Sequence, residues 1–177
     1  MPKRLSEKEI LKTKVFTAKE IELEYDDGKR GTHQIIERPD VSIIIPLTDS
    51  GTLFLVKEYS TAFDDYRLDL PGGKIDPGKN ALETANRELQ EEIGFKASML
   101  NQIGMFTVSP GYMTQKSYVF LARSLSESKL EGDEHEPLER VEHPFDRFEE
   151  LIENGQLSEA RAIAALYLAR KYIQENR

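Results

Sequence analysis

The chain contains no cysteine among its 177 residues. This excludes disulfide bonds, thiolate zinc sites and cysteine nucleophiles. It also lacks any apolar run near the roughly 18 residues of a membrane-spanning helix. Its first 16 residues include basic side chains but no apolar core of a secretory signal. We therefore expect a cytoplasmic protein that has no membrane partner.

Positive charge is scarce as well. The chain has 24 Lys and Arg against 32 Asp and Glu, a formal net charge of −8 and a pI near 5.1. A surface that binds nucleic acid by neutralising phosphates needs the opposite balance, so we expect no nucleic-acid partner. An acidic protein that handles an acidic substrate needs cations, which favours bound metal, although many proteins are acidic for solubility alone.

The length suits one full domain. Residues 15–36 predict a β-hairpin, because apolar and acidic residues alternate before the Asp27-Gly28 turn. We expect residues 1–40 to form this hairpin extension and residues 41–177 the main domain. Strands, a central helix, further strands and two C-terminal helices then follow in order, with the helices near 145–154 and 158–175. This order predicts an α/β or α+β layered domain.

Residues 80–93 give the clearest helix signal. Asn80 can cap its start, Glu83 stands where a capping box places its acid, and Gly94 fits the left-handed stop. Apolar residues recur at steps of three or four and form one face: Ala81, Leu82, Ala85, Leu89 and Ile93.

Three carboxylates lie opposite that apolar face. Glu88 is three residues before Glu91 and four before Glu92, so all three share one side of the helix. A divalent cation would turn their repulsion into coordination, and Mg²⁺ prefers such oxygen ligands. An acidic helix is more often a solvated face than a metal site. The preceding Gly72-Gly73 pair and the short loop 74–78 make the metal site the more specific interpretation.

These residues resemble the signature of the Nudix hydrolase family. That signature runs glycine, five residues, glutamate, seven residues, then R-E-U-x-E-E-x-G-U, where U is a bulky apolar residue. The match extends from Gly73 to Phe95 and departs at Lys79, where the family has its first glutamate. In the family that acid helps to hold the loop by pairing with the signature arginine, and Asp76 or Glu83 could replace it here. The matching residues are Gly73, Arg87, Glu88, Leu89, Glu91, Glu92, Gly94 and Phe95.

The resemblance implies a fold and a metal centre. The fold is a mixed β-sheet sandwiched between helices, here with an N-terminal antiparallel hairpin. Glu88 and Glu92 would be the principal ligands of Mg²⁺, or of Mn²⁺, with Glu91 as a further contact and the Gly72 carbonyl as another candidate. Arg87 would orient the carboxylates by charge-assisted hydrogen bonds. The bound ions would neutralise a pyrophosphate, activate water and stabilise the leaving oxygen.

The flanking segments resemble the ADP-ribose pyrophosphatase branch of the family. They are 70–78, 109–112 and 130–138. This likeness implies ADP-ribose, NADH and diadenosine polyphosphates as substrates, each cut to AMP and a second phosphate. It places the general base on a loop after the last strands, with Glu134 the best match and Glu136 the next. The same acidic loop could instead be merely solvated.

Other residues are candidates for holding the nucleotide substrate. Ser109, Gly111 and Tyr112 belong to a Ser-Pro-Gly-Tyr segment that is either a simple turn or a substrate loop. Arg38 and Arg67 could each bind a phosphate, or could pair with a nearby acid such as Asp69.

Two alternative functions fit the same signature, and the sequence also predicts an oligomeric state. A nucleoside-triphosphate sanitising enzyme would keep the fold and change the substrate. A Nudix-fold module that binds without catalysis would explain Lys79, although the acids of Arg87–Glu92 are intact. The N-terminal hairpin predicts a homodimer, because such strands in this branch commonly pack against a partner subunit.

Overall fold

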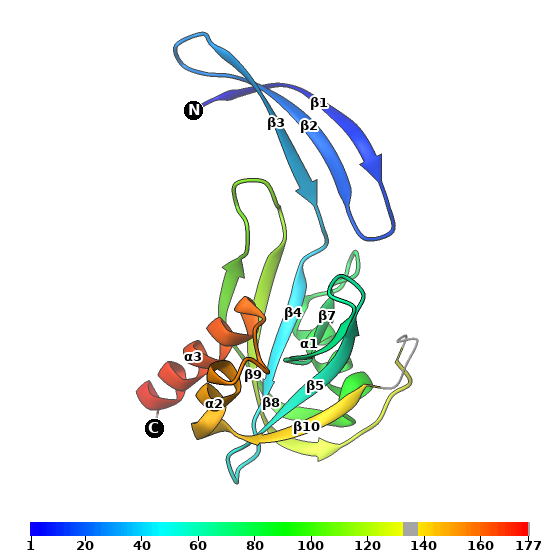
Figure 1. The fold of residues 1–177 in the computed structure, drawn as a ribbon, viewed down its shortest axis with the longest axis vertical. Helices are drawn as coiled ribbons and strands as arrows, with labels where there is room; N and C mark the ends of the chain where they lie inside the picture. The colour runs from blue at the N-terminus through cyan, green and yellow to red at the C-terminus, as the bar shows by residue number, and fades with distance from the viewer. Residues whose placement is uncertain (133–137, 177) are drawn as a thin grey trace. The chain divides into compact units, whose positions relative to one another are not determined.

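A computed structural model describes residues 1–132 and 138–176 of the chain. The chain divides into two compact units (Figure 1). The first unit comprises Met1–Asp40 together with Thr107–Lys116, and the second comprises Val41–Phe106 together with Ser117–Arg177. Each unit has its own sheet structure, so the N-terminal segment is a body distinct from the main domain.

The first unit is a three-stranded antiparallel sheet of β1 (Lys3–Lys12), β2 (Thr17–Glu24) and β3 (Arg30–Glu37). The predicted hairpin corresponds to β2 and β3. Its turn needs a glycine because Gly28 has a φ of 79°, in the left-handed region. Strand β1 was not predicted, because its largely polar sequence shows no clear apolar alternation.

The second unit contains two sheets. In the four-stranded sheet β7-β4-β9-β8, strand β4 (Val41–Pro46) runs parallel to β9 (Lys116–Glu127) and antiparallel to β7 (Gly72–Lys74). Strand β8 spans Phe95–Thr107. The three-stranded antiparallel sheet consists of β10 (Glu139–Pro144), β5 (Thr52–Ser60) and β6 (Asp65–Asp69), in that order.

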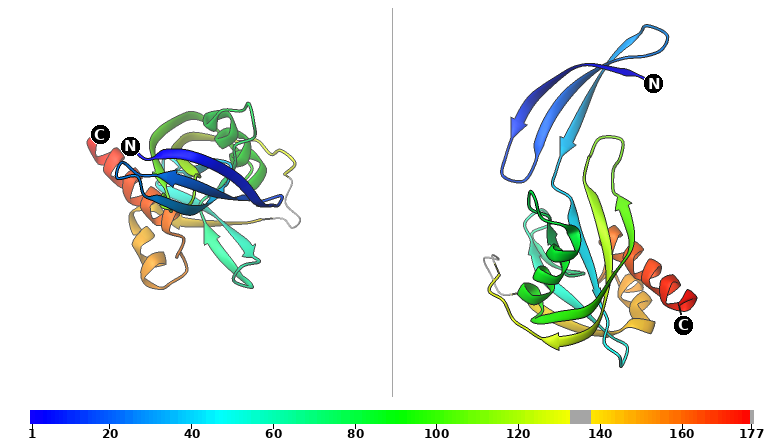
Figure 2. Two further views of the ribbon diagram at one scale, coloured as in Figure 1. Left: turned by 90° about the horizontal axis from the view of Figure 1, so that it is seen from above. Right: turned by 180° about the vertical axis from the view of Figure 1, so that it is seen from behind.

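Helices cover both faces of the mixed sheet. Helix α1 (Ala81–Glu92) lies on one side, and α2 (Phe148–Glu153) and α3 (Ala160–Glu175) lie on the other (Figures 1 and 2). Side chains of a strand alternate between faces. Ile44 therefore packs into the cluster with α1, while Ile43 and Ile45 pack into the cluster with α2 and α3. The predicted sheet between helices is confirmed.

The predicted C-terminal helices are also present. A 3-10 turn, η1 (Phe145–Arg147), leads directly into α2, so the first of them is shorter than the pattern suggested. In α3 the small residues Ala162, Ala165 and Ala169 are fully buried and let the helix approach the sheet closely. No helix of the described residues is both long and apolar enough to cross a membrane.

Burial of Asp69 should make stability depend on pH. Burial, reinforced by the nearby charge of Glu159, raises the pKa of Asp69 from 3.8 to about 7. Between those values the folded chain holds a proton that the unfolded chain has lost, so stability falls as pH rises. We expect the free energy of unfolding in urea to fall between pH 4.5 and pH 8, and to fall by about 2–3 kcal/mol more in the wild type than in Asp69→Asn. Equal pH slopes in the two proteins would refute this.

Candidate metal-dependent active site

A side-chain cap, a glycine stop and a hydrogen bond to β4 fix the position of helix α1, which carries the three acids. The Asn80 side chain accepts a hydrogen bond from the Glu83 amide at 2.8 Å, as predicted, and so caps the helix. Gly94 follows the helix with a φ of 78°, the left-handed conformation expected of a stop. The Ser42 hydroxyl donates to the Ala81 carbonyl at 2.7 Å and ties the first turn of α1 to β4.

The two glycines before the loop let the chain pass close to this helix. The Gly72 amide donates to Oε2 of Glu92 at 3.0 Å. A Cβ on Gly73 would overlap the Glu88 carboxylate, and a Cβ on Gly72 would overlap the backbone carbonyl of Ser42. A side chain at Gly72 would meet fixed backbone, whereas one at Gly73 would displace the Glu88 carboxylate. The pair therefore joins β7 closely to the acidic face of α1.

Arg87 holds two of the acids. Its guanidinium donates to the carboxylates of Glu88 and Glu91. Partial burial is the largest influence on the Arg87 pKa and lowers it, but Glu88, Glu91 and Asp76 together outweigh burial and raise that pKa. Glu88 itself is only 6% exposed. A buried carboxylate needs such partners, because an isolated buried charge is strongly disfavoured.

A recess of about 350 Å³ opens beside these residues. Its wall brings together residues from β5, β7, the loop after β7 and α1. One of its acids, Glu58, was not predicted at the site, whereas Asp76 was expected only as a replacement partner for Arg87. Glu58 is missed because its strand carries no signal of the site; it lies on β5, in the other sheet of the unit from β7, and only the folded chain brings it to the recess. The recess is lined by Glu58, Gly72, Gly73, Lys74, Asp76, Arg87, Glu88 and Glu92.

The chemistry of this recess fits a hard divalent cation. Glu58, Glu88 and Glu92 offer carboxylate oxygens, and Gly72 lies at the same wall. Mg²⁺ and Mn²⁺ take oxygen ligands of this kind, usually a few carboxylates completed by water and substrate phosphates. Within residues 1–132 and 138–176, no three acidic or histidine side chains lie in an arrangement that could hold a metal ion as they stand. Water and substrate phosphates would therefore have to complete the coordination of a cation in this recess.

Asp76 lies close to Lys79, which occupies the position of the family's first glutamate. The Asp76 carbonyl accepts a hydrogen bond from the Lys79 amide at 3.0 Å, while its carboxylate lies 3.4 Å from Nζ of Lys74. Its charge contributes to the raised pKa of Arg87. Of the two acids expected to replace the missing glutamate, Asp76 therefore has an electrostatic link to Arg87.

The residues predicted to hold substrate lie in both units. Arg67, in the second unit, donates to the Ser158 hydroxyl at 3.0 Å and stacks over the Phe63 ring at 4.3 Å. Arg38 belongs to the first unit, where its amide donates to Thr114 at 3.4 Å. Their assignment to phosphate binding stays a prediction.

The Ser-Pro-Gly-Tyr segment forms a turn within the first unit. The Ser109 carbonyl accepts hydrogen bonds from the Tyr112 and Met113 amides at 3.0 and 2.8 Å. The Tyr112 carbonyl in turn accepts one from the Ile36 amide at 2.6 Å, which anchors the turn to β3. The Tyr112 side chain is half exposed, and a Cβ on Gly111 would meet open space. Glu134 and Glu136, the predicted bases, lie outside the described residues.

The fold and the acidic recess together define a metal-dependent hydrolase of the Nudix class, and the family comparison agrees. The NUDIX domain profile matches residues 37–166, so the chain belongs to this family. Members of the family use divalent metal ions.

Two curated relatives align over nearly the whole chain. The chain is 34% identical to "ADP compounds hydrolase NudE" of Escherichia coli (strain K12), covering 98% of this chain and 94% of that protein. It is also 34% identical to "ADP-ribose pyrophosphatase" of Bacillus subtilis (strain 168), covering 96% of each. A solved "Crystal structure of ADP compounds hydrolase" superimposes with a TM-score of 0.91 and 34% identity, over 99% of this chain and 95% of that one.

Proposed function

We propose that this protein is a pyrophosphohydrolase that cleaves ADP-linked compounds, with Mg²⁺ or Mn²⁺ as cofactor. The substrates would include ADP-ribose, NADH and diadenosine polyphosphates, each cut to AMP and a second phosphate. The observation that carries the proposal is the buried Glu88 carboxylate packed against Gly73 in an acid-lined recess. The names of the two full-length relatives support ADP-linked substrates.

The acids of α1, the Gly72 carbonyl and Arg87 have separate roles in this proposal. Glu88 and Glu92 would hold the cation, with Glu91 and the Gly72 carbonyl as further ligands, and Arg87 would keep the carboxylates in place. The bound cation would neutralise the pyrophosphate and lower the pKa of water. A water oxygen would attack one phosphorus, the bridging P–O bond would break, and the proton of that water would pass to a carboxylate, for which we propose Glu134 before Glu136.

We further propose that Arg38, Arg67, Ser109, Gly111 and Tyr112 contact the nucleotide. A guanidinium pairs well with phosphate oxygens, and an exposed tyrosine ring can stack on a base. Tyr112 suits the second role because its ring is half exposed while its backbone is anchored to β3.

A substrate panel tests the activity. Purified protein is incubated with ADP-ribose, NADH, a diadenosine polyphosphate and dGTP, with Mg²⁺, Mn²⁺ or chelator, and AMP or other products are quantified. We expect AMP from the ADP-linked compounds only when metal is present. Activity on dGTP alone would establish the triphosphate-sanitising alternative. Absence of all metal-dependent turnover would favour a binding module without catalysis.

Arg87 should act as a positioning residue rather than as a ligand. Arg87→Gln loses the charge that holds Glu88 and Glu91, so we expect the metal concentration for half-maximal rate to rise about 10- to 100-fold. Saturating metal should restore much of kcat. The metal concentration for half-maximal rate of Arg87→Lys should lie between those of the wild type and Arg87→Gln. A kcat that stays equally low at every metal concentration would contradict this role.

We also propose a homodimer formed through the N-terminal unit. Strand β1 carries exposed apolar side chains at Ile10 and Leu11, and Val15 follows them. Light scattering coupled to size exclusion tests this proposal: a mass twice that of the 20.3 kDa chain is expected, and a monomer at every concentration would refute it.

A further inference from the structure

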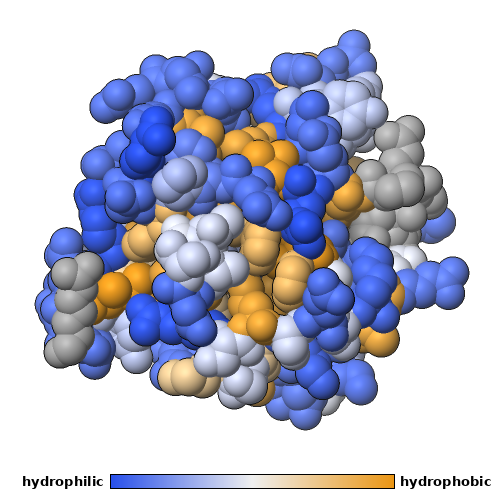
Figure 3. Space-filling model, turned by 90° about the horizontal axis from the view of Figure 1, so that it is seen from below, coloured by the Kyte–Doolittle hydropathy of each residue, from blue (hydrophilic) through white to orange (hydrophobic). Residues whose placement is uncertain are grey.

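A second cavity lies in the main domain, away from the acidic recess. The glycine pair of the recess sits beside the start of β4, opposite Ser42 and Ile43. The second cavity, of about 730 Å³, opens beyond the other end of β4 and is lined by the turn of residues 47–52. Figure 3 views this end of the unit, where apolar surface gathers at the centre and polar side chains surround it.

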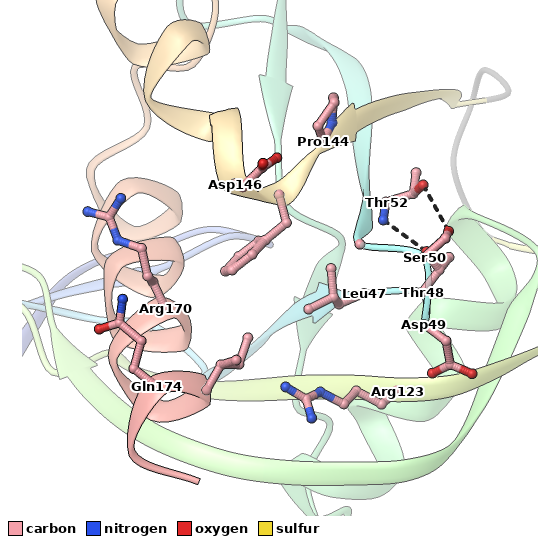
Figure 4. A pocket seen from close by; sticks show the side chains of 13 residues that line it. Leu47, Thr48, Asp49, Ser50, Thr52, Arg123, Pro144, Asp146, Arg170 and Gln174 are labelled. Atoms are coloured by element: carbon pink, nitrogen blue, oxygen red, sulfur yellow. Dashed lines mark hydrogen bonds between the residues drawn. The ribbon is translucent and has the colours of Figure 1, made fainter. Parts of the chain in front are cut away.

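Arg123 is the charged group that distinguishes this cavity. Its side chain extends from β9 into the cavity (Figure 4) and is half-buried. Among residues 1–132 and 138–176, its guanidinium forms no hydrogen bond or ion pair. Arg170, the second guanidinium at the wall, already pairs with Glu149 at 2.9 and 3.2 Å. A half-buried guanidinium without a partner is a ready site for an oxyanion.

The backbone beside Arg123 is unusual. Ser124 has a φ of 51°, in the left-handed region that a serine rarely occupies. Ser124 does not itself line the cavity, so this conformation bears only on how the chain is held beside Arg123.

The rest of the wall supplies the groups that a nucleoside would need. Phe145 and Ile173, which are partly buried, line the wall beside the buried Leu47 and present apolar surface against which a planar ring can pack. The exposed carboxylates of Asp49 and Asp146 can accept hydrogen bonds from hydroxyl or amino groups. These two acids also disfavour a bare polyanion, so the wall suits a ligand with one anionic group and several donors.

We propose that this cavity is a second ligand site, which takes a nucleoside monophosphate with its phosphate on Arg123. Its volume is in the range of small-molecule pockets, about 300–1,000 Å³. The ring would pack on Phe145 and Ile173, and the ribose hydroxyls would donate to the aspartates. This site is separate from the proposed active site and does not depend on hydrolysis.

Metal-free protein isolates this site, because the carboxylates of the recess repel anions when no cation is bound. AMP, adenosine and inorganic phosphate are each titrated into ¹⁵N-labelled protein with chelator, and backbone amide shifts are followed. We expect AMP to shift the amides of residues 47–52 and Arg123, and to bind at least about tenfold tighter than adenosine or phosphate.

Two variants with the same change of charge complete the test. Arg123→Gln should weaken AMP binding about tenfold or more. Arg147→Gln is the control, because the Arg147 guanidinium pairs with Glu150 and does not line the cavity; its affinity should equal that of the wild type.

Three results would overturn the proposal. One is AMP shifts confined to Gly72, Gly73 and their neighbours. Another is unchanged affinity in Arg123→Gln. The last is binding of phosphate or adenosine as tight as that of AMP. If Arg123→Gln does not fold, the positions of the AMP-induced amide shifts in the wild type still show whether AMP binds in this cavity.

Discussion

Glu92→Gln is expected to lower kcat for ADP-linked substrates about a thousandfold while the protein stays folded. Glutamine keeps the size of the side chain and can still accept from the Gly72 amide, but it loses the charge that would hold the cation. The free energy of unfolding should stay equal or rise, since one of several clustered negative charges is removed. Steady-state rates check the loss of kcat, and urea unfolding of the same preparations checks the free energy of unfolding.

Glu83→Gln provides the matched control for Glu92→Gln. Glu83 lies on the same helix but is exposed in its first turn and does not line the recess. Glu83→Gln should keep kcat within about twofold of the wild type and lower the free energy of unfolding by only a few tenths of a kcal/mol. Equal activity in the two variants would show that Glu92 is not a metal ligand of the active site.

Gly73→Ala is expected to disable the enzyme through Glu88 itself. The added methyl group occupies space now filled by the Glu88 carboxylate, so the carboxylate must swing away. We expect activity to fall about a hundredfold, because small displacements of a positioned group are costly. Stability should fall by about 1–3 kcal/mol.

A second substitution shows whether this clash is the cause. In a Glu88→Ala background the obstructing carboxylate is gone, so Gly73→Ala should then cost less than about 1 kcal/mol. Gly72→Ala is the comparison, because its methyl group would meet the backbone carbonyl of Ser42 rather than a side chain. It should destabilise both backgrounds equally. Additive effects of Gly73→Ala and Glu88→Ala would mean that the two residues do not compete for space.

The parts of the site that were predictable from sequence are local. The Asn80 cap, the Gly94 stop and the shared face of Glu88, Glu91 and Glu92 all follow from helix geometry over a few residues. The alternation of β4 between two cores follows from the period of a strand in the same way. These features need no knowledge of distant partners.

The features that sequence reasoning missed depend on distant partners. Glu58 lies on β5, whereas the glycine pair of the recess belongs to another sheet, so the two meet only in the folded unit. Arg67, a candidate phosphate ligand, contacts Ser158, a residue 91 positions away. Strand β1 forms because β2 offers it an edge, although its own sequence is largely polar.

By itself the sequence determined the helix with three acids on one face, the glycine pair before it, and hence the family to which the chain belongs. Only the tertiary structure decided that Glu58 joins those acids, that Asp76 rather than Glu83 lines the same recess, and that Arg123 faces a second cavity. The physical reason is the range of the contacts. Helix caps and side-chain periodicity act within one or two turns of chain, whereas a recess is assembled by strand register and packing between residues far apart in sequence.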